Sequence, residues 1–143
     1  MDKSLMGTFA LALLMGLVLG VLSGCVRWIA FMPRPRACDL FVYIGILYWV
    51  RLAVNPFLMF TVFYLHGRKL DLKAKLRSVI VLLFLGLYVG YFLGNMIPYP
   101  VLTSYPAPLS YILFHSLYPL TIICPFFLAL SASAIAYIRR NEN

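Results

Sequence analysis

The sequence predicts an all-α membrane protein, a single integral membrane domain folded as a four-transmembrane-helix bundle. Two features of its composition and one of its pattern carry this prediction. Of the 143 residues, 64% are hydrophobic and only 11% are charged, and the hydrophobic residues fall in four continuous runs. A soluble chain needs roughly a quarter of its residues charged to cover its surface. The runs also lack the alternation that a lipid-facing β-strand requires.

The four runs set the expected bounds of the transmembrane helices. They cover residues 5–32, 40–65, 78–97 and 109–138. Each has about 20 residues or more, enough to cross a hydrocarbon core of about 30 Å at about 1.5 Å per residue. The connections between the runs are too short to fold on their own, so we expect no soluble domain.

The first and third runs carry three glycines each at strict four-residue spacing. These six are Gly16, Gly20, Gly24, Gly86, Gly90 and Gly94. Residues four apart share one helix face, so each helix presents a groove without side chains. In lipid, such a groove lets two backbones approach closely. We therefore interpret the six glycines as helix-packing sites, in the pattern called a glycine zipper.

The end of the first run allows an alternative interpretation. Leu22, Ser23, Gly24 and Cys25 match the cleavage box of bacterial lipoproteins, in which the cysteine is lipidated and the preceding helix is removed. However, the apolar run before Cys25 has about 20 residues, whereas the core of a signal peptide has about 7–15. The run also continues beyond the cysteine to Phe31. We therefore expect the helix to be retained.

The second run holds a charged residue at membrane depth, Arg51, with Asn55 and Pro56 one turn later. None of the four runs contains an acidic residue that would neutralise it. A membrane arginine usually faces protein or a wet cavity, or extends its side chain to the headgroups. Two interpretations stay open: Arg51 and Asn55 contact a ligand or a partner, or Arg51 only reaches the outer leaflet.

The segment between the second and third runs, residues 66–77, mixes leucines with basic residues. Its cations are Arg68, Lys69, Lys73, Lys75 and Arg77. We expect this segment to lie along the inner headgroups as an anionic-lipid surface, where each cation contributes about 1 kcal/mol. His66 has no second ligand at metal spacing, and we interpret it as a boundary residue.

The basic residues also predict the orientation. Eight of the twelve lie in the N-terminus, the 66–77 segment and the C-terminal tail. By the positive-inside rule, both termini and this segment are cytoplasmic, and we expect a location in the plasma (inner) membrane. The net charge of +8 then reflects topology and anionic lipids. We expect no nucleic-acid partner, because no loop is long enough to form such a module.

The fourth run contains Pro119 and Pro125, which predict a kink or a break because proline lacks a backbone N–H. Residues 129–136 in its second half are mostly alanine and serine, which suits close packing of helices. The loop before this run, residues 98–108, carries four prolines, two tyrosines and no charge. We expect that loop at the outer interface or against a partner.

The two sets of glycines are offset by 70 residues, from position 16 to position 86, which suggests a tandem repeat of two helical hairpins. Leu47 and Tyr48 match Leu117 and Tyr118 at the same offset. Two such copies share one topology and are related by an axis along the membrane normal. The first and third helices would then run parallel and meet through their glycine faces.

No motif in the sequence names a substrate or a reaction. The first hypothesis is a non-catalytic structural or assembly subunit of a membrane complex, because the glycine faces, Arg51 and the uncharged outer loop all favour partners or self-association. The alternative is an oligomeric transporter or channel for an anionic solute or a lipid headgroup, with Arg51, Asn55 and the proline-containing helices along its path.

An enzyme is the least favoured of the function classes. The runs contain no acidic residue and a single histidine at depth, so they offer no paired carboxylates and no base beside a nucleophile. The three cysteines have no paired spacing. We therefore expect no metal site, no disulfide framework and no cofactor.

Overall fold

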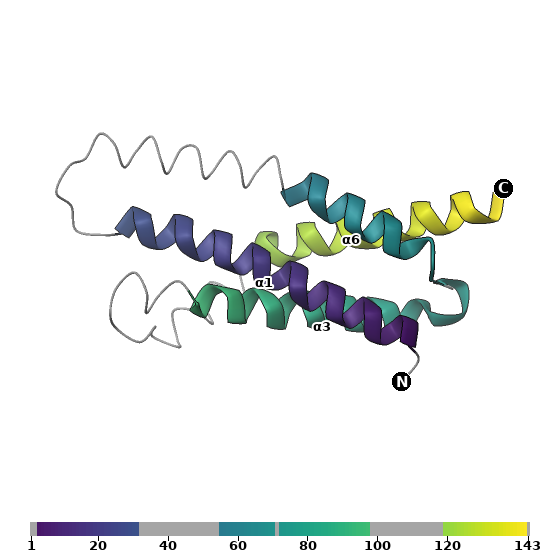
Figure 1. The fold of residues 1–143 in the computed structure, drawn as a ribbon, viewed down its shortest axis with the longest axis horizontal. Helices are drawn as coiled ribbons and strands as arrows, with labels where there is room; N and C mark the ends of the chain where they lie inside the picture. The colour runs from purple at the N-terminus through teal and green to yellow at the C-terminus, as the bar shows by residue number, and fades with distance from the viewer. Residues whose placement is uncertain (1–2, 32–54, 71, 98–118, 143) are drawn as a thin grey trace.

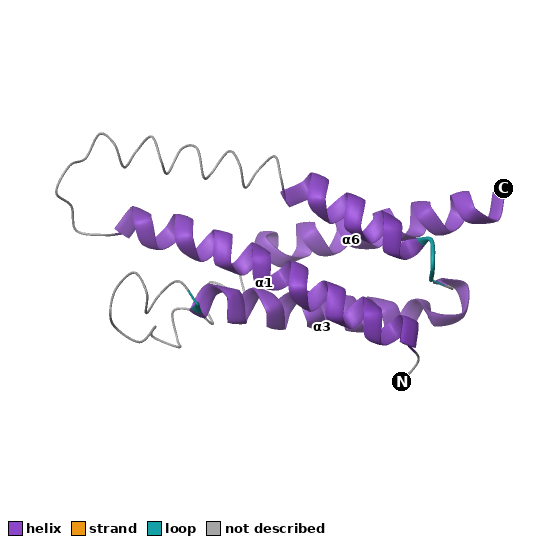
Figure 2. Cartoon of the chain, viewed as in Figure 1, coloured by secondary structure: helices purple, strands orange, loops and turns teal. Residues whose placement is uncertain are grey.

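The computed structural model describes residues 3–31, 55–70, 72–97 and 119–142, which are drawn as ribbon in Figure 1. These residues form four helices, and none of them belongs to a strand (Figure 2). Several predictions fall outside the described residues. They concern Arg51, the outer loop at 98–108, residues 40–54 of the second run and residues 109–118 of the fourth.

Three of the four helices are long. Helix α1 covers Lys3–Phe31, α3 covers Leu72–Met96 and α6 covers Pro119–Glu142. Each contains a segment that is long and apolar enough to cross a membrane, as expected of an integral membrane protein. The fourth helix covers residues 55–67, the described part of the second run, and a turn at residues 68–70 follows it.

Helix α1 agrees with the first run to within two residues at its start, but α3 begins six residues before its run. The sequence between Leu72 and Ser78 consists of lysine, alanine, leucine and arginine, which all favour a helix. No glycine or proline stands there to stop it. The basic residues Lys75 and Arg77 are therefore helical and belong to the first turns of α3.

The last helix also differs from its prediction. Pro125 lies inside α6, which continues through it, so there is no break at this proline, and the kink that was the other expectation stays a prediction. At the other end α6 extends to Glu142 and takes in Arg139 and Arg140. Positive side chains in the last turn of a helix are stabilising because they face the negative end of its dipole.

The helices are arranged so that basic residues gather at one end of the bundle. Helices α1 and α3 begin at this end, and α6 ends there, so the N- and C-termini lie close to the same end (Figure 1). We call it the basic end. Its described basic residues are Lys3, Arg68, Lys69, Lys75, Arg77, Arg139 and Arg140. The far end of α1 and α3 is called the opposite end.

Helices α1 and α3 run parallel and lie side by side (Figure 1). Their contacts follow the same order along both helices, because Leu13 lies against Gly90 and Leu17 lies against Gly94. Parallel neighbours in a membrane protein are joined through an intervening crossing, which fits the two-hairpin order of the chain.

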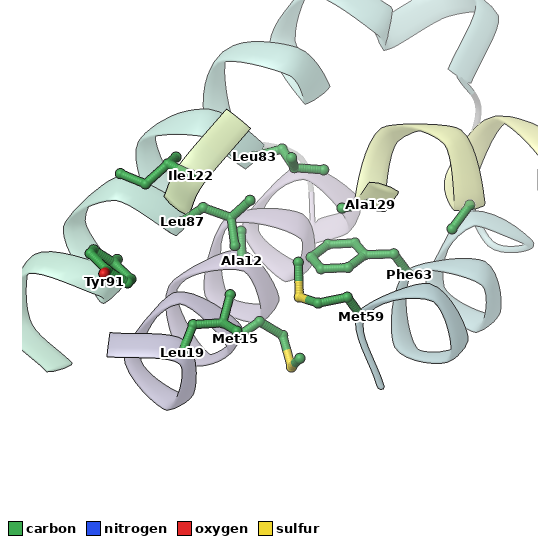
Figure 3. Packing of buried hydrophobic residues seen from close by; sticks show 11 residues of the cluster. Ala12, Met15, Leu19, Met59, Phe63, Leu83, Leu87, Tyr91, Ile122 and Ala129 are labelled. Atoms are coloured by element: carbon green, nitrogen blue, oxygen red, sulfur yellow. The ribbon is translucent and has the colours of Figure 1, made fainter. Parts of the chain in front are cut away.

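The centre of the bundle is filled by side chains from all four helices. Ala12, Met15 and Leu19 come from α1, Leu83, Leu87 and Tyr91 from α3, Met59 and Phe63 from helix 55–67, and Ile122, Ala129 and Ala132 from α6. Figure 3 shows Met59 and Phe63 reaching from helix 55–67 toward α1. Helix 55–67 is thereby packed into the same core as the three long helices.

Candidate functional sites

The glycines of α1 and α3 bring the two backbones into direct contact. A methyl group placed on Gly86 would lie 2.8 Å from the Ala12 Cβ, and one placed on Gly94 would lie 2.9 Å from the Gly20 Cα. On Gly90 it would overlap the Leu13 carbonyl oxygen. These approaches are shorter than non-bonded carbon contacts of about 3.5–4.0 Å allow. No larger residue fits there unless a backbone moves.

The two glycine rows meet in a register that the sequence did not predict. Ala12 lies against Gly86 and Gly20 against Gly94, so the offset across the interface is 74 residues. The 70-residue offset of the sequence pattern would instead pair Gly20 with Gly90 and Gly24 with Gly94. The difference of four residues is one helical turn, or about 6 Å. This register departs from the exact two-fold relation that two identical hairpins would have. The tandem repeat itself stays a prediction.

A buried polar cluster lies toward the opposite end of the same interface. The Tyr91 hydroxyl donates a hydrogen bond to the Ser23 Oγ at 3.0 Å, and the Asn95 Nδ2 donates to the Tyr91 carbonyl oxygen at 2.9 Å. Ser23, Tyr91 and Asn95 are each at most 3% exposed. Among the residues that the structure describes, the Asn95 Oδ1 has no hydrogen-bond partner. A flip of the Asn95 amide would place its oxygen against the Tyr91 carbonyl oxygen and leave the Nδ2 group without an acceptor. A flip therefore does not remove the unpaired polar atom.

Sequence reasoning missed this cluster, although a signal was present. Asn95 interrupts an otherwise apolar run, and a polar residue within a membrane span is a candidate for function. An unpaired amide oxygen in an apolar surrounding costs roughly 2 kcal/mol or more. The oxygen is also fully enclosed, which leaves no water-sized space beside it. The arrangement is therefore a local cost to folding and not a ready-made binding pocket.

A second close helix contact joins helix 55–67 to α6. A methyl group on Gly67 would lie 2.6 Å from the Ser133 Cα, and the Ser133 Oγ donates a hydrogen bond to the Phe63 carbonyl oxygen at 3.3 Å. Ala129 and Ala132 on the same helix are fully buried. The small residues at 129–136 therefore allow the close packing that their composition indicates.

At the basic end, His66 links helix 55–67 to α1. Its Nε2 lies 3.0 Å from the Thr8 Oγ1, and the Thr8 hydroxyl lies 2.9 Å from the Ser4 carbonyl oxygen. The hydroxyl has one hydrogen, which it donates to that carbonyl, so the His66 Nε2 carries a proton and donates to Thr8. That His66 is a boundary residue stays a prediction; in the structure it is half-buried and takes part in the packing.

The surroundings of His66 disfavour its charged form. Burial is the main cause that lowers the pKa of His66 below its ordinary value, and the positive charge of Lys69 lowers it further. His66 follows the predicted second span at 40–65, so this shift concerns a group outside the predicted membrane-spanning segments. At neutral pH the imidazole is neutral and keeps its proton on Nε2.

Two further contacts hold the basic end together. The Arg140 Nη1 donates to the Arg68 carbonyl oxygen at 3.0 Å, and the Arg140 guanidinium lies 5.5 Å from the centre of the Tyr137 ring. The Lys75 Nζ lies 3.4 Å from the Ser4 Oγ. The contact of Arg140 with Arg68 joins α6 to the turn at 68–70, and the contact of Lys75 with Ser4 joins α3 to α1.

The leucines of the 66–77 segment are divided between core and surface. Leu70 and Leu72 are buried with Val79, and Leu5 and Tyr137 pack against them. Leu76, in contrast, is exposed. The segment is therefore anchored in the bundle by two of its leucines, and only part of it is available to lie on a membrane surface.

The remaining predicted site residues are placed as follows. Asn55 is buried at the described start of helix 55–67, whereas Arg51 lies outside the described residues. Lys73 is part of α3, but its side chain is outside the described part. Cys25 and Cys124 are free thiols. Within residues 3–31, 55–70, 72–97 and 119–142, no three histidine, cysteine or acidic side chains come together as metal ligands.

Comparisons with protein-family models, with curated proteins and with solved structures gave no match for this chain. Function is therefore inferred from the contacts described above and from the chemistry of the residues that make them.

Proposed function

We propose that the protein is a non-catalytic structural or assembly subunit of a membrane complex. The observation that supports this most directly is the α1–α3 pair, in which backbones touch along three glycines of α3. Such a pair is a stiff element, because neither helix can shift without a steric clash. A stiff helix pair with apolar outer faces is suited to holding other membrane helices in place.

The glycines act, in this proposal, as an intramolecular glycine zipper. Because α1 and α3 use their glycine faces on each other, partners or further copies would dock on outward faces. The outward faces of the bundle carry large exposed apolar residues, among them Phe57 on helix 55–67, Val81 on α3 and Phe127 on α6. In lipid, such side chains are equally compatible with acyl chains and with the helices of a partner.

The proposed setting is the plasma (inner) membrane with both termini in the cytoplasm. The gathering of basic residues at one end, together with both termini, supports this orientation. A membrane-impermeant thiol reagent tests it in intact cells that carry a single added cysteine. A cysteine at Ser104 should react and one at Lys73 should not. Labelling at Lys73 would reverse the orientation.

Co-purification tests the subunit role. The tagged protein is extracted in mild detergent and its mass is measured by native mass spectrometry. We expect it with other membrane proteins, or as an oligomer, in stoichiometric amounts. A Phe57→Ala, Phe127→Ala variant should lose partners while keeping its own thermal stability, since both side chains point away from the core. A protein that is monomeric and alone in the mildest conditions would contradict the proposal.

The alternative is an oligomeric transporter or channel for an anionic solute or lipid headgroup. One observation favours keeping it: Asn55, a polar residue of the second run, is buried in helix 55–67. Buried polar groups in membrane proteins often mark a pathway. Anion flux into proteoliposomes distinguishes the two functions, because a structural subunit gives none.

Substitution of Arg51 sharpens that test. If Arg51 holds an anion in a forked pair, Arg51→Lys should fail, because an ammonium lacks the planar pair of donors. Arg51→Leu should then also abolish flux or release the partner. If Arg51 only extends to the headgroups, Lys should replace it and Leu should be neutral or stabilising. Thermal stability and co-purification are measured for both variants beside the parent.

A further inference from the structure

The basic end is a strongly charged surface made by four separate parts of the chain. Among the described residues it holds seven basic side chains and one acidic side chain, Glu142. They come from the start of α1, the turn at 68–70, the first turns of α3 and the last turn of α6. Six of the seven basic residues are exposed, and Lys75 is half-buried. The sequence predicted an anionic-lipid surface on 66–77 and placed both termini on the same side of the membrane, and in the fold Lys3, Arg139 and Arg140 lie at the same end of the bundle as that segment.

This surface rests on a fixed apolar base. Leu70 and Leu72 are 1% and 5% exposed, Val79 is fully buried, and Leu5 and Tyr137 complete the cluster. The base therefore takes side chains from the same four parts of the chain that supply the cations. Because the base is packed, the backbones that carry the cations are held relative to one another and do not have to be ordered when an anion binds.

The tail is tied to the turn by a specific contact. The Arg140 guanidinium donates to the Arg68 carbonyl oxygen and lies over the Tyr137 ring. A guanidinium has five N–H donors, and this bond uses one of them. Arg140 is thus held at the surface against the turn that carries Arg68 and Lys69, although Arg68 is 72 positions away in the sequence.

We infer that the basic end binds the phosphate-bearing headgroups of anionic phospholipids as one composite site, to which the start of α1 and the α6 tail contribute together with the 66–77 segment. Lipid is the partner that the position favours, because this end terminates three helices able to span a membrane and headgroups lie at that level. The inference depends on the proposed membrane setting and not on the subunit role.

The test compares anionic with zwitterionic lipid. The purified protein is mixed with micelles containing phosphatidylglycerol or phosphatidylcholine, and the difference in Tm between the two lipids is measured for each variant. We expect phosphatidylglycerol to raise Tm in the parent. The gain should fall by a similar part, about a quarter to a third, in the turn variant Arg68→Gln, Lys69→Gln and in the tail variant Arg139→Gln, Arg140→Gln, because each removes two of the seven described cations. Arg34→Gln, Arg36→Gln, predicted at the other headgroup level, is the charge-matched control and should lose less of the gain than either of these variants.

Further variants separate lipid binding from folding. Arg140→Lys keeps the charge but not the fork that reaches the Arg68 carbonyl, so it should lower Tm in both lipids and keep most of the gain. A tail variant that keeps the full gain while the turn variant loses it would overturn the composite site. An equal gain with inorganic phosphate in phosphatidylcholine would assign the site to a soluble anion instead. Either result leaves the co-purification test of the subunit role unaffected.

Discussion

Helices α1 and α3 pack differently from helix 55–67 and α6, although small residues are central to both contacts. Between α1 and α3, glycines face backbone atoms at several successive turns, and a methyl group on Gly86, Gly90 or Gly94 meets main chain that cannot move alone. Between helix 55–67 and α6, the corresponding close approach is found at Gly67 against Ser133. Beyond that point Phe63 and Met59 fill the space with side chains.

The difference determines what each contact tolerates. A side chain in a core can change rotamer when a neighbour grows, whereas a helix backbone moves only as a unit. We therefore expect the α1–α3 contact to fail when a residue is enlarged, and the contact of helix 55–67 to fail when a residue is reduced. The predictions below test this contrast, beginning with the largest effect.

Enlarging Gly90 should have the largest effect. Gly90→Leu places a bulky group against the Leu13 carbonyl, and we expect a loss of about 3 kcal/mol or more. Gly90→Ala should cost about 1–3 kcal/mol, although alanine favours a helix. Unfolding in detergent, followed by circular dichroism, measures both.

Gly7→Ala is the matched control for this pair. It makes the same chemical change in α1, but its methyl group meets only the end of the His66 ring at 3.3 Å. We expect it to be neutral or slightly stabilising. If Gly90→Ala and Gly7→Ala have the same stability, the backbone contact described for α1 and α3 is absent in the membrane protein.

Gly16, Gly20, Gly86, Gly90 and Gly94 lie where α1 and α3 approach closely, but the glycine spacing alone does not determine the register of the two helices. A row repeated every four residues matches itself again when one helix slides by one turn, so 70- and 74-residue offsets look equivalent. The choice is made by residues outside the row. In the 74-residue register the small residue Ala12 faces Gly86, and the Tyr91 hydroxyl reaches Ser23. Neither contact has a sequence signal of its own.

Reducing Phe63 should break the other contact. Phe63 is fully buried between helix 55–67, α1 and α6. Phe63→Ala leaves a cavity, and we expect a loss of about 2 kcal/mol. This is less than the 3–5 kcal/mol typical of water-soluble cores, because lipid already solvates an apolar ring. Phe60→Ala on the same helix, whose side chain is more exposed, is the control for loss of a ring. An equal loss of stability in both variants would show that burial of the Phe63 ring in the core contributes no more than the exposed ring of Phe60.

The apolar runs of the sequence predicted where the helices lie. They did not predict the polar contacts between the helices. Long apolar runs fix where helices lie, because length and hydropathy alone decide what crosses a bilayer. Thr8 and His66 looked unremarkable in the sequence, since a threonine in an apolar run and a histidine at its edge are both common. Their pairing depends on how α1 and helix 55–67 pack, which no local pattern encodes.

Removing the Tyr91 hydroxyl should have a smaller effect than either packing change. Tyr91→Phe keeps the ring in the core and removes the hydrogen bond to Ser23. Hydrogen bonds between membrane helices contribute about 0.6 kcal/mol on average, and we expect a loss of this size. Tyr88→Phe, on the more exposed side of α3, controls for loss of a hydroxyl. A loss above about 2 kcal/mol would exceed the largest values known for such bonds and would assign the cluster a further role.

The smallest effect concerns pH and the polar contact at the basic end. Burial and Lys69 lower the pKa of His66 in the folded protein, so the unfolded chain takes up the proton first as pH falls. Above the ordinary histidine pKa of about 6.5 both states are neutral, and stability does not depend on this group. Below that value, down to the lowered folded pKa, stability should decrease with falling pH. The Nε2–H bond to Thr8 survives protonation, so the cost is only that of a half-buried charge beside Lys69. Thermal unfolding between pH 7.5 and pH 5, as chosen test conditions covering about one unit on either side of that pKa, should show this decrease in the parent and in His115→Gln, and not in His66→Gln. A slope that persists in His66→Gln would assign the dependence to another group.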